Sequence, residues 1–241
     1  PEQVIHRMHK MIKTTTLPKF CRKINSIDEI NNYFTVNLTN RYERVRIIGD
    51  IHGCYTALQQ AITPWDEKTL YIFCGDYLER GIENKEMIYE MMRLSTLPNT
   101  IMLEGNHERH IANFAFNSKL DHSKRFMKEV VAPIVKNMTK KDVESLQREL
   151  RLFYKSLRQC YPFSFHGKKY LVSHGGLSYV PNMTFIATST FINGFGAYET
   201  DIAKIYDNNY EKGMCQNFIQ IHGHRGVPDG KYSFCLEGEV E

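Results

Sequence analysis

The sequence has no apolar run near the roughly 20 residues that a membrane-spanning helix needs. Its opening stretch, PEQVIHRMHKMIK, is polar and basic, so it does not have the pattern of a signal peptide. We therefore expect no membrane segment. The six cysteines form no C-x-x-C pair, which argues against a thiolate zinc site and a disulfide framework. We expect reduced thiols in a cytoplasmic protein.

The net charge of +4 is unevenly distributed along the 241 residues. Residues 199–241 hold eight acidic and four basic side chains, so residues 1–198 carry a net charge of +8. A basic surface attracts phosphate-rich partners, although a solvated surface rich in lysine and arginine gives the same balance. The chain begins without methionine and ends abruptly at CLEGEVE, and we expect it to be a piece of a longer protein.

Short apolar runs, each stopped by glycine, predict buried strands separated by helices. The predicted strands cover 44–50, 69–76, 99–108 and 168–176, with helices at 55–62 and 84–94. Continuous apolar runs are typical of strands that are buried on both faces. The order β-α-β-α-β predicts a layered α/β core.

The second half of the chain is predicted to hold a helical block and further strands. The block covers about 107–158, and Thr139 and Asp142 predict a capping box at the start of its last helix. A hairpin is predicted to turn at 166–168, a strand to cover 217–227, and the tail to form a hairpin or edge strands. Residues 178–196 show no clear period.

Five predicted strand ends carry polar motifs: GDIHG, GDYLERG, GNHE, SHGG and HGHR. Ligand sites of open α/β sheets lie beyond the carboxyl ends of the strands, so we expect these motifs to converge. Alternate residues of an extended strand end point the same way, which would let Asp50 and His52 hold one ion together. Asp76 would bridge to a second ion. The expected metal ligands are Asp50, His52, Asp76, Asn106, His174 and His224.

All six donors are nitrogen or oxygen, which favours Mn²⁺, Fe or Zn²⁺ over a structural zinc site. Two divalent ions, two aspartates and a bridging hydroxide would leave about one positive charge, which attracts phosphate. The ions would also lower the pKa of the bridging water, so that a hydroxide nucleophile exists near neutral pH.

The five motifs, spread over residues 45–227, resemble those of the calcineurin-like metallophosphoesterases, and the phosphoprotein-phosphatase branch most closely. The resemblance implies a four-layer α/β/β/α sandwich with a helical insert and two divalent ions, Mn²⁺ first, with Fe, Ni or Zn as alternatives. It implies in-line attack on phosphorus by the bridging hydroxide. It also implies that Asp50, His52 and Asp76 hold one ion. The second ion would be held by Asp76, Asn106, His174 and His224.

The same resemblance assigns catalytic roles to three further residues. His107 matches the general acid that protonates the leaving oxygen, a role typically worth ~10²–10⁴ in rate. Arg80 matches the residue that grips phosphate oxygens. Glu79 stands where the family usually has aspartate, and we expect it to orient His107. The family's second phosphate-binding arginine has no match between the SHGG and HGHR histidines. Its candidate replacements are Lys204, Lys212 and Arg225.

Two shorter resemblances concern the substrate. The opening stretch is similar to the closing segment of polynucleotide-kinase-type domains, and YSFCLEGEVE is similar to the junction before a ligase-like module in bacterial RNA-repair enzymes. Together they imply a polynucleotide kinase-phosphatase. Residues 1–43 would then be a lead-in from a kinase domain, and 44–241 the metallophosphoesterase domain. Kinase and ligase modules would belong to the same full-length chain.

The expected activity is removal of terminal 3′ or 2′ phosphates from RNA or DNA ends, with opening of 2′,3′-cyclic phosphate as an extension. The alternatives are a serine/threonine protein phosphatase, a dinucleoside polyphosphate hydrolase, and a non-catalytic scaffold module. A complete ligand set together with His107 argues against the scaffold.

Overall fold

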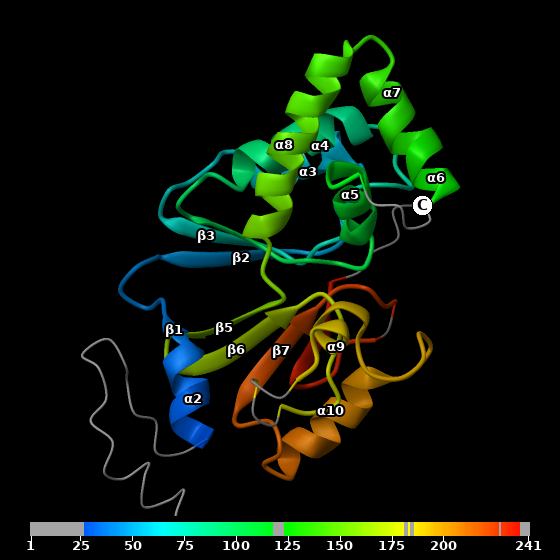
Figure 1. Ribbon diagram of the computed structural model, residues 1–241. Helices are drawn as coiled ribbons and strands as arrows, with labels where there is room; N and C mark the ends of the chain where they lie inside the picture. The colour runs from blue at the N-terminus through cyan, green and yellow to red at the C-terminus, as the bar shows by residue number, and fades with distance from the viewer. Residues whose placement is uncertain (1–26, 118–122, 181–182, 184–185, 227, 237–241) are drawn as a thin grey trace, which may run out of the picture.

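Two β-sheets face each other at the centre of the molecule (Figure 1). The computed structural model describes residues 27–117, 123–180, 183, 186–226 and 228–236. The smaller sheet has the order β2-β3-β4, and the larger has the order β1-β5-β6-β7-β8. The strands are β1 (Val36–Asn37), β2 (Arg44–Ile48), β3 (Thr69–Phe73), β4 (Thr100–Met102), β5 (Cys160–Phe165), β6 (Lys168–Ser173), β7 (Phe218–His222) and β8 (Ser233–Cys235).

The smaller sheet is entirely parallel, and β3 lies in its middle. All five residues of β3 are buried, as predicted for a strand covered on both faces. The same prediction is wrong for β2, which leaves Arg44 and Arg46 exposed. The reason is position, because β2 is an edge strand of its sheet and has a neighbour on one side only.

The larger sheet is mixed, and its one antiparallel pair is the predicted hairpin of β5 and β6. His166 and Gly167 connect these strands with φ values of 46° and 76°. Two left-handed residues in a two-residue loop form the turn that matches the twist of a hairpin. Strands β7 and β8 add to the sheet in parallel, so β8 is an edge strand and not half of a hairpin.

Helices cover the outer face of each sheet, which confirms the predicted four-layer α/β/β/α sandwich (Figure 1). The helices are α2 (Ile27–Phe34), α3 (Tyr55–Ile62), α4 (Asn84–Leu94), α5 (Glu108–Ala115), α6 (Lys124–Phe126), α7 (Ala132–Val135), α8 (Lys140–Ser156), α9 (Thr188–Asn193) and α10 (Ile202–Glu211). Helices α3 and α4 have the predicted bounds. None of the helices in the described ranges is long and apolar enough to cross a membrane.

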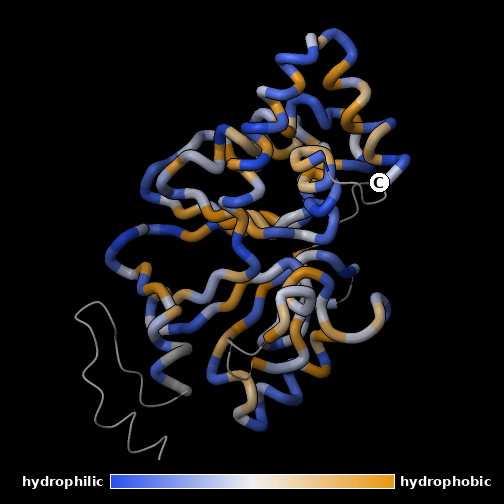
Figure 2. Tube along the Cα trace, in the orientation of Figure 1, coloured by the Kyte–Doolittle hydropathy of each residue, from blue (hydrophilic) through white to orange (hydrophobic). Residues whose placement is uncertain are grey.

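The alternation of side chains along the strands explains the three cores. Tyr71 and Phe73 of β3 pack under α3, α4, α5 and α8, while Leu70 and Ile72 point to the opposite side and pack between the sheets. Leu171 of β6 packs in the core shared with α9 and α10. Figure 2 shows the corresponding apolar stretches along the strands and on the helices.

The predicted helical insert at 107–158 is present as α5 to α8. Thr139 and Asp142 form the predicted capping box, in which each side chain bonds the other residue's backbone N–H. The segment Met127–Val131 is a π-helix directly before Pro133 of α7. Proline cannot donate to the carbonyl four residues earlier, so a wider turn accommodates it.

Several predicted boundaries are wrong or lie outside the described residues. Each strand that precedes a polar motif ends earlier than predicted, so the predicted metal ligands lie in loops rather than on strands. Residues 178–196 contain α9. The opening stretch 1–26 and the end 237–241 lie outside the described residues. The domain division at residue 43 stays a prediction; β1, which precedes it, pairs with β5 of the larger sheet.

Candidate metal centre

The loops that follow five parallel-paired strands carry the predicted metal ligands. Strands β2, β3 and β4 are parallel neighbours in one sheet, and β6 and β7 are parallel neighbours in the other. Their carboxyl ends therefore meet at one edge of the sandwich. The ligands follow in the order Asp50 and His52 after β2, Asp76 after β3, Asn106 after β4, His174 after β6, and His224 after β7.

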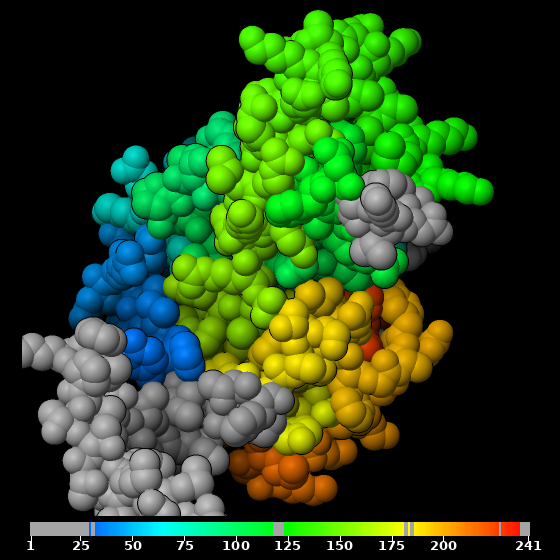
Figure 3. Space-filling view, viewed as in Figure 1, coloured from blue at the N-terminus to red at the C-terminus, as the bar shows by residue number. Residues whose placement is uncertain are grey.

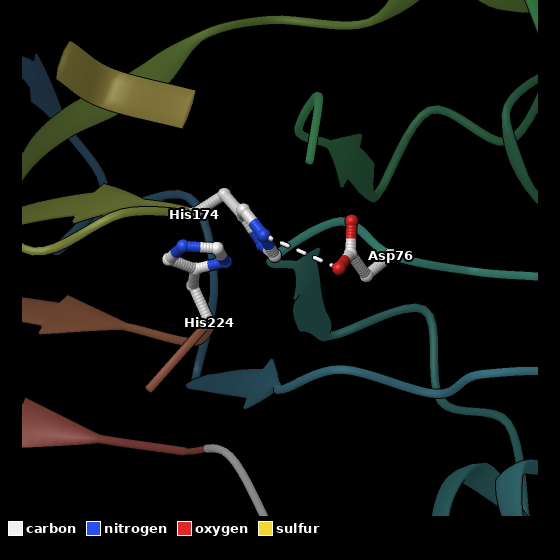
Figure 4. A group of neighbouring side chains, drawn as sticks. All are labelled: Asp76, His174 and His224. Carbon is white, nitrogen blue, oxygen red and sulfur yellow. Dashed lines mark ion pairs between the residues drawn. The ribbon is translucent and has the colours of Figure 1, made fainter. Parts of the chain in front are cut away.

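One group of three donors combines both sheets. The ligand atoms of Asp76, His174 and His224 lie within 4.8 Å of one another, and all three side chains are drawn in Figure 4. His174 Nε2 is 3.4 Å from Asp76 Oδ2 and 2.9 Å from Asn106 Oδ1. Asn106 therefore joins this group, as its predicted role requires. His174 Nδ1 lies 3.0 Å from the carbonyl oxygen of Cys74, which directs Nε2 toward the acidic side chains.

A second group of three donors shares Asp76 with the first. The ligand atoms of Asp50, His52 and Asp76 also lie within 4.8 Å of one another. The buried Nε2 of His52 has no hydrogen-bond partner among the described residues, and it lies 3.8 Å from Asp76 Oδ2. Its Nδ1 lies 3.2 Å from the carbonyl oxygen of Leu78. A buried ring nitrogen without a partner, facing carboxylates, fits a metal ligand.

The backbone at the centre adopts conformations that side chains rarely allow. Left-handed φ values occur at His52 (47°), Asp76 (52°), Glu79 (73°), Arg80 (66°) and His224 (69°). Such residues cost free energy and collect at functional sites. The prediction that Asp50 and His52 alternate along an extended strand end is therefore wrong. Strand β2 ends at Ile48, and a tight turn brings the two residues together.

The electrostatic potential at the centre favours a cation. Burial alone lowers the pKa of His174, but the carboxylates of Asp76 and Asp50 raise it to about 9. The pKa of His224 falls to about 4, mainly through burial and then through the neighbouring His174. The negative potential that raises the pKa of His174 would also attract a divalent ion. The ligands of that ion must be neutral imidazole and ionised carboxylate. The donor set therefore fits two divalent ions that share Asp76.

Sequence reasoning gave no role to Glu108, which lies at the centre of the strand-end loops. Its Oε2 accepts hydrogen bonds from the backbone N–H groups of Asp76 (2.9 Å) and Gly105 (2.7 Å), and its Oε1 accepts one from Tyr77 (3.1 Å). Burial, together with the carboxylate of Asp76, raises its pKa to about 7. The signal in the sequence was its place in the GNHE motif, directly after Asn106 and His107.

Replacing Glu108 with glutamine is expected to lower the free energy of unfolding by about 1–3 kcal/mol. The amide group would turn a donor toward one of three buried backbone donors. Because the loops of Asp76 and Asn106 would then be held less firmly, we also expect Mn²⁺ affinity to fall by about 10–100-fold. Urea unfolding and calorimetric Mn²⁺ titration measure the two effects. Glu149→Gln, on the exposed side of α8, is the matched control; equal behaviour of the two variants would contradict the positioning role.

A second polar pair borders the metal centre. His107, the residue before α5, places its Nδ1 2.5 Å from Glu79 Oε2 and its Nε2 3.8 Å from Asp76 Oδ2. Its backbone N–H donates to Asp76 Oδ1 at 2.9 Å. Burial opposes protonation, but the hydrogen bond to Glu79 and the charge of Asp76 raise the pKa of His107. The structure thus brings Glu79 and His107 together, as predicted, and Arg80 next to them is exposed.

The candidate replacements for the second phosphate-binding arginine lie elsewhere. Arg225 is 1% exposed, and its guanidinium donates to the carbonyl oxygens of Ala197 (2.7 Å) and Asn193 (3.1 Å). It therefore holds the loop after α9 in place. Lys204 is exposed on α10, and Lys212 follows the C-terminal end of that helix.

Curated relatives cover only parts of this chain. It is 35% identical over 83 residues to serine/threonine-protein phosphatase 2 of Salmonella typhimurium, a match over 33% of this chain and 36% of that protein. It is 27% identical over 126 residues to the PP2A-like serine/threonine-protein phosphatase PPG1 of Candida albicans, over 49% of this chain and 29% of the relative. The chain thus spans about a third of the length of the curated relatives that it matches.

A solved structure and a family model match most of the chain. The crystal structure of a protein described as a candidate diadenosine tetraphosphatase superposes with a TM-score of 0.54 at 17% identity, over 85% of this chain and 87% of that one. This likeness supports the fold. The family model for calcineurin-like phosphoesterases matches residues 43–240, which include every strand-end motif described above. The chain therefore belongs to the calcineurin-like phosphoesterases, hydrolases of phosphate esters that use divalent metal ions.

Proposed function

We propose that this domain is a binuclear-metal phosphomonoesterase that removes terminal 3′ or 2′ phosphates from RNA or DNA ends and opens 2′,3′-cyclic phosphates. The observation that carries the reaction type is the sharing of Asp76 by two groups of metal-type donors. A scaffold module would not need this arrangement with the His107–Glu79 pair beside it.

Each residue of the centre has a defined task in the proposed reaction. Two divalent ions, when bound, would polarise the phosphoryl oxygens and lower the pKa of water. Glu79 engages Nδ1 of His107, so Nε2 is the atom that holds the proton facing the site. That proton passes to the ester oxygen as its bond to phosphorus breaks. Arg80, exposed at the rim, binds phosphate oxygens. We propose Mn²⁺ as the metal, since the donors are only nitrogen and oxygen.

The choice of nucleic-acid ends as substrate is supported by charge. Residues 1–198 carry a net charge of +8, which suits a polyanionic partner. The resemblances at the two ends of the chain support kinase and ligase modules in the same full-length protein. Cys54, Cys74, Cys160 and Cys215 are thiols outside any disulfide, in agreement with the cytoplasmic location that we propose.

The second candidate is a serine/threonine protein phosphatase, favoured by the named activities of the two curated relatives. A dinucleoside polyphosphate hydrolase is the third candidate, because the crystal structure with a TM-score of 0.54 is described as a candidate diadenosine tetraphosphatase. With Mn²⁺ present, kcat/KM on a 3′-phosphorylated oligonucleotide, a phosphopeptide and diadenosine tetraphosphate separates the three. The proposal expects the oligonucleotide to be the best substrate. A phosphopeptide or tetraphosphate turned over more efficiently would overturn it.

Replacing Glu79 with glutamine is expected to move the alkaline limb of the kcat profile to lower pH. Glu79 raises the pKa of His107, so the protonated form of His107 persists to a higher pH than that of an ordinary histidine. Without the carboxylate, that form is lost earlier as the pH rises. The pH dependence of kcat for both proteins measures the shift, with Glu86→Gln on the exposed side of α4 as control. An unmoved limb would contradict the role of Glu79.

A further inference from the structure

A cavity of about 380 Å³ opens beside the metal centre, between the loop after β4 and the helix α9. In Figure 3 the yellow segment that contains α9 lies against the green surface of α5. The polar lining of the cavity consists of Glu104, Asn106, Arg109, Thr188, Ser189 and Asn193. The cavity shares Asn106 with the metal centre, so the two sites are adjacent.

The lining of the cavity contains one available cation. Arg109 lies in the first turn of α5, three residues after Asn106, and its side chain is exposed. It has no ion pair or hydrogen bond with any other residue of the described ranges. The carboxylate of Glu104 is engaged at the cavity wall, where Oε1 accepts the hydroxyl of Tyr154 at 2.5 Å. Thr188, Ser189 and Asn193 add hydroxyl and amide groups from the opposite side.

A second cavity, of about 410 Å³, shares the lining residue Thr188 with the first. It contains Arg158, whose Cζ lies 5.4 Å from the ring centre of Tyr161, and the half-exposed ring of Phe34. Together the two cavities present Arg109, Arg158 and the half-exposed ring of Phe34, whereas Tyr161 is buried. Cations interleaved with aromatic rings are typical of surfaces that bind single-stranded nucleic acid.

We propose that the first cavity binds the phosphodiester next to the terminal phosphate, with Arg109 as its specificity-determining contact. This inference rests on the proposed function, because it assumes a nucleic-acid strand at the metal centre. The guanidinium group presents two parallel N–H donors that match the two free oxygens of a phosphodiester. The hydroxyl group of Ser189 supplies a further donor, whereas that of Thr188 donates to Gln159 Oε1 at 3.2 Å. The strand then continues past Thr188 toward Arg158.

The test compares three substrates with Mn²⁺ present: a nucleoside 3′-monophosphate, a dinucleotide 3′-phosphate, and the same dinucleotide with an uncharged methylphosphonate linkage. The wild type should hydrolyse the charged dinucleotide with the highest kcat/KM. Arg109→Ala should raise KM for it by about 10-fold or more, since a charge-assisted hydrogen bond is lost, and leave kcat nearly unchanged. The same variant should treat the monophosphate as the wild type does and should not distinguish the two linkages. Arg109→Lys should recover part of the preference.

The exposed Arg148 of α8 provides the matched control, and Arg148→Ala should behave as the wild type. Unchanged hydrolysis of the monophosphate shows that Arg109→Ala folds and keeps its metal centre. The inference is overturned if Arg109→Ala loses the same activity on all three substrates. It is also overturned if the variant hydrolyses all three as the wild type does. A wild type that hydrolyses no 3′-phosphorylated substrate, but does act on a phosphopeptide, would overturn the proposed function itself and the inference with it.

Discussion

Replacing His107 with alanine is expected to lower kcat on a 3′-phosphorylated oligonucleotide by about 10²–10⁴-fold. The leaving group is a ribose hydroxyl, a poor leaving group unless it is protonated as its bond to phosphorus breaks. Nε2 of His107 faces the centre, and Glu79 fixes the ring through Nδ1. Among the described histidines that are not predicted metal ligands, His107 alone combines these two contacts. Its loss therefore removes the proton donor without removing a metal ligand.

The leaving group provides the decisive control for this variant. With p-nitrophenyl phosphate the leaving phenolate needs no proton, so the same substitution should cost much less. Bound Mn²⁺ per chain, measured by elemental analysis after gel filtration, should equal that of the wild type. His166→Ala, in the β5–β6 turn, should retain full activity. If His107→Ala kept the rate of the wild type, the general-acid role of His107 would be wrong. Turnover that does not depend on metal would support the scaffold alternative.

Local sequence signals were sufficient for the elements that lie close together along the chain. Helices α3 and α4 have the predicted bounds, because a glycine-containing motif precedes each and the apolar period ends sharply. The capping box of α8 was readable for the same reason, since Thr139 and Asp142 contact each other across three residues. Strand β3 was readable as a continuous buried run.

Contacts between distant segments were not readable. The exposure of β2 depends on which strands become edges, and this is decided by sheet order rather than by the residues of β2. Helix α9 has six residues with one buried apolar side chain, Phe191, so no period marks it. Arg225 is buried because carbonyl groups some 30 residues earlier accept its donors. No pattern around Arg225 indicates that partner.

The metal-type side chains of the candidate site were easier to predict than the backbone conformations and hydrogen bonds that position them. Metal-type donors follow glycine-ended apolar runs, so their convergence follows from the rule for strand ends alone. The left-handed backbone of His52 and Asp76 follows from the tight loops, not from residue type, and it was missed. Glu108 was missed because its partners are backbone N–H groups, which are the same for every residue. Side-chain chemistry is visible in a sequence, whereas the backbone donors that it satisfies are not.

Replacing Asp76 with asparagine is expected to abolish tight binding at both metal positions, whereas His52→Ala should affect only one. Asp76 is the donor common to the two groups, so each group loses a buried carboxylate in this variant. The amide oxygen still accepts the N–H of His107, so the loop keeps its fold. Mn²⁺ affinity should fall by more than the roughly 10–100-fold that loss of an outer-sphere partner costs. Activity should fall to that of the metal-free protein.

Two measurements separate a shared ligand from a merely nearby one. Calorimetric titration should give two Mn²⁺ ions per wild-type chain, one for His52→Ala, and none at micromolar concentration for Asp76→Asn. The electron paramagnetic resonance spectrum should show coupled Mn²⁺ ions in the wild type and an isolated ion in His52→Ala. If Asp76→Asn kept one tight site, the carboxylate would serve a single ion, and the two groups of donors would not share a ligand. The strained backbone at Asp76 would then lack the function that the shared position gives it.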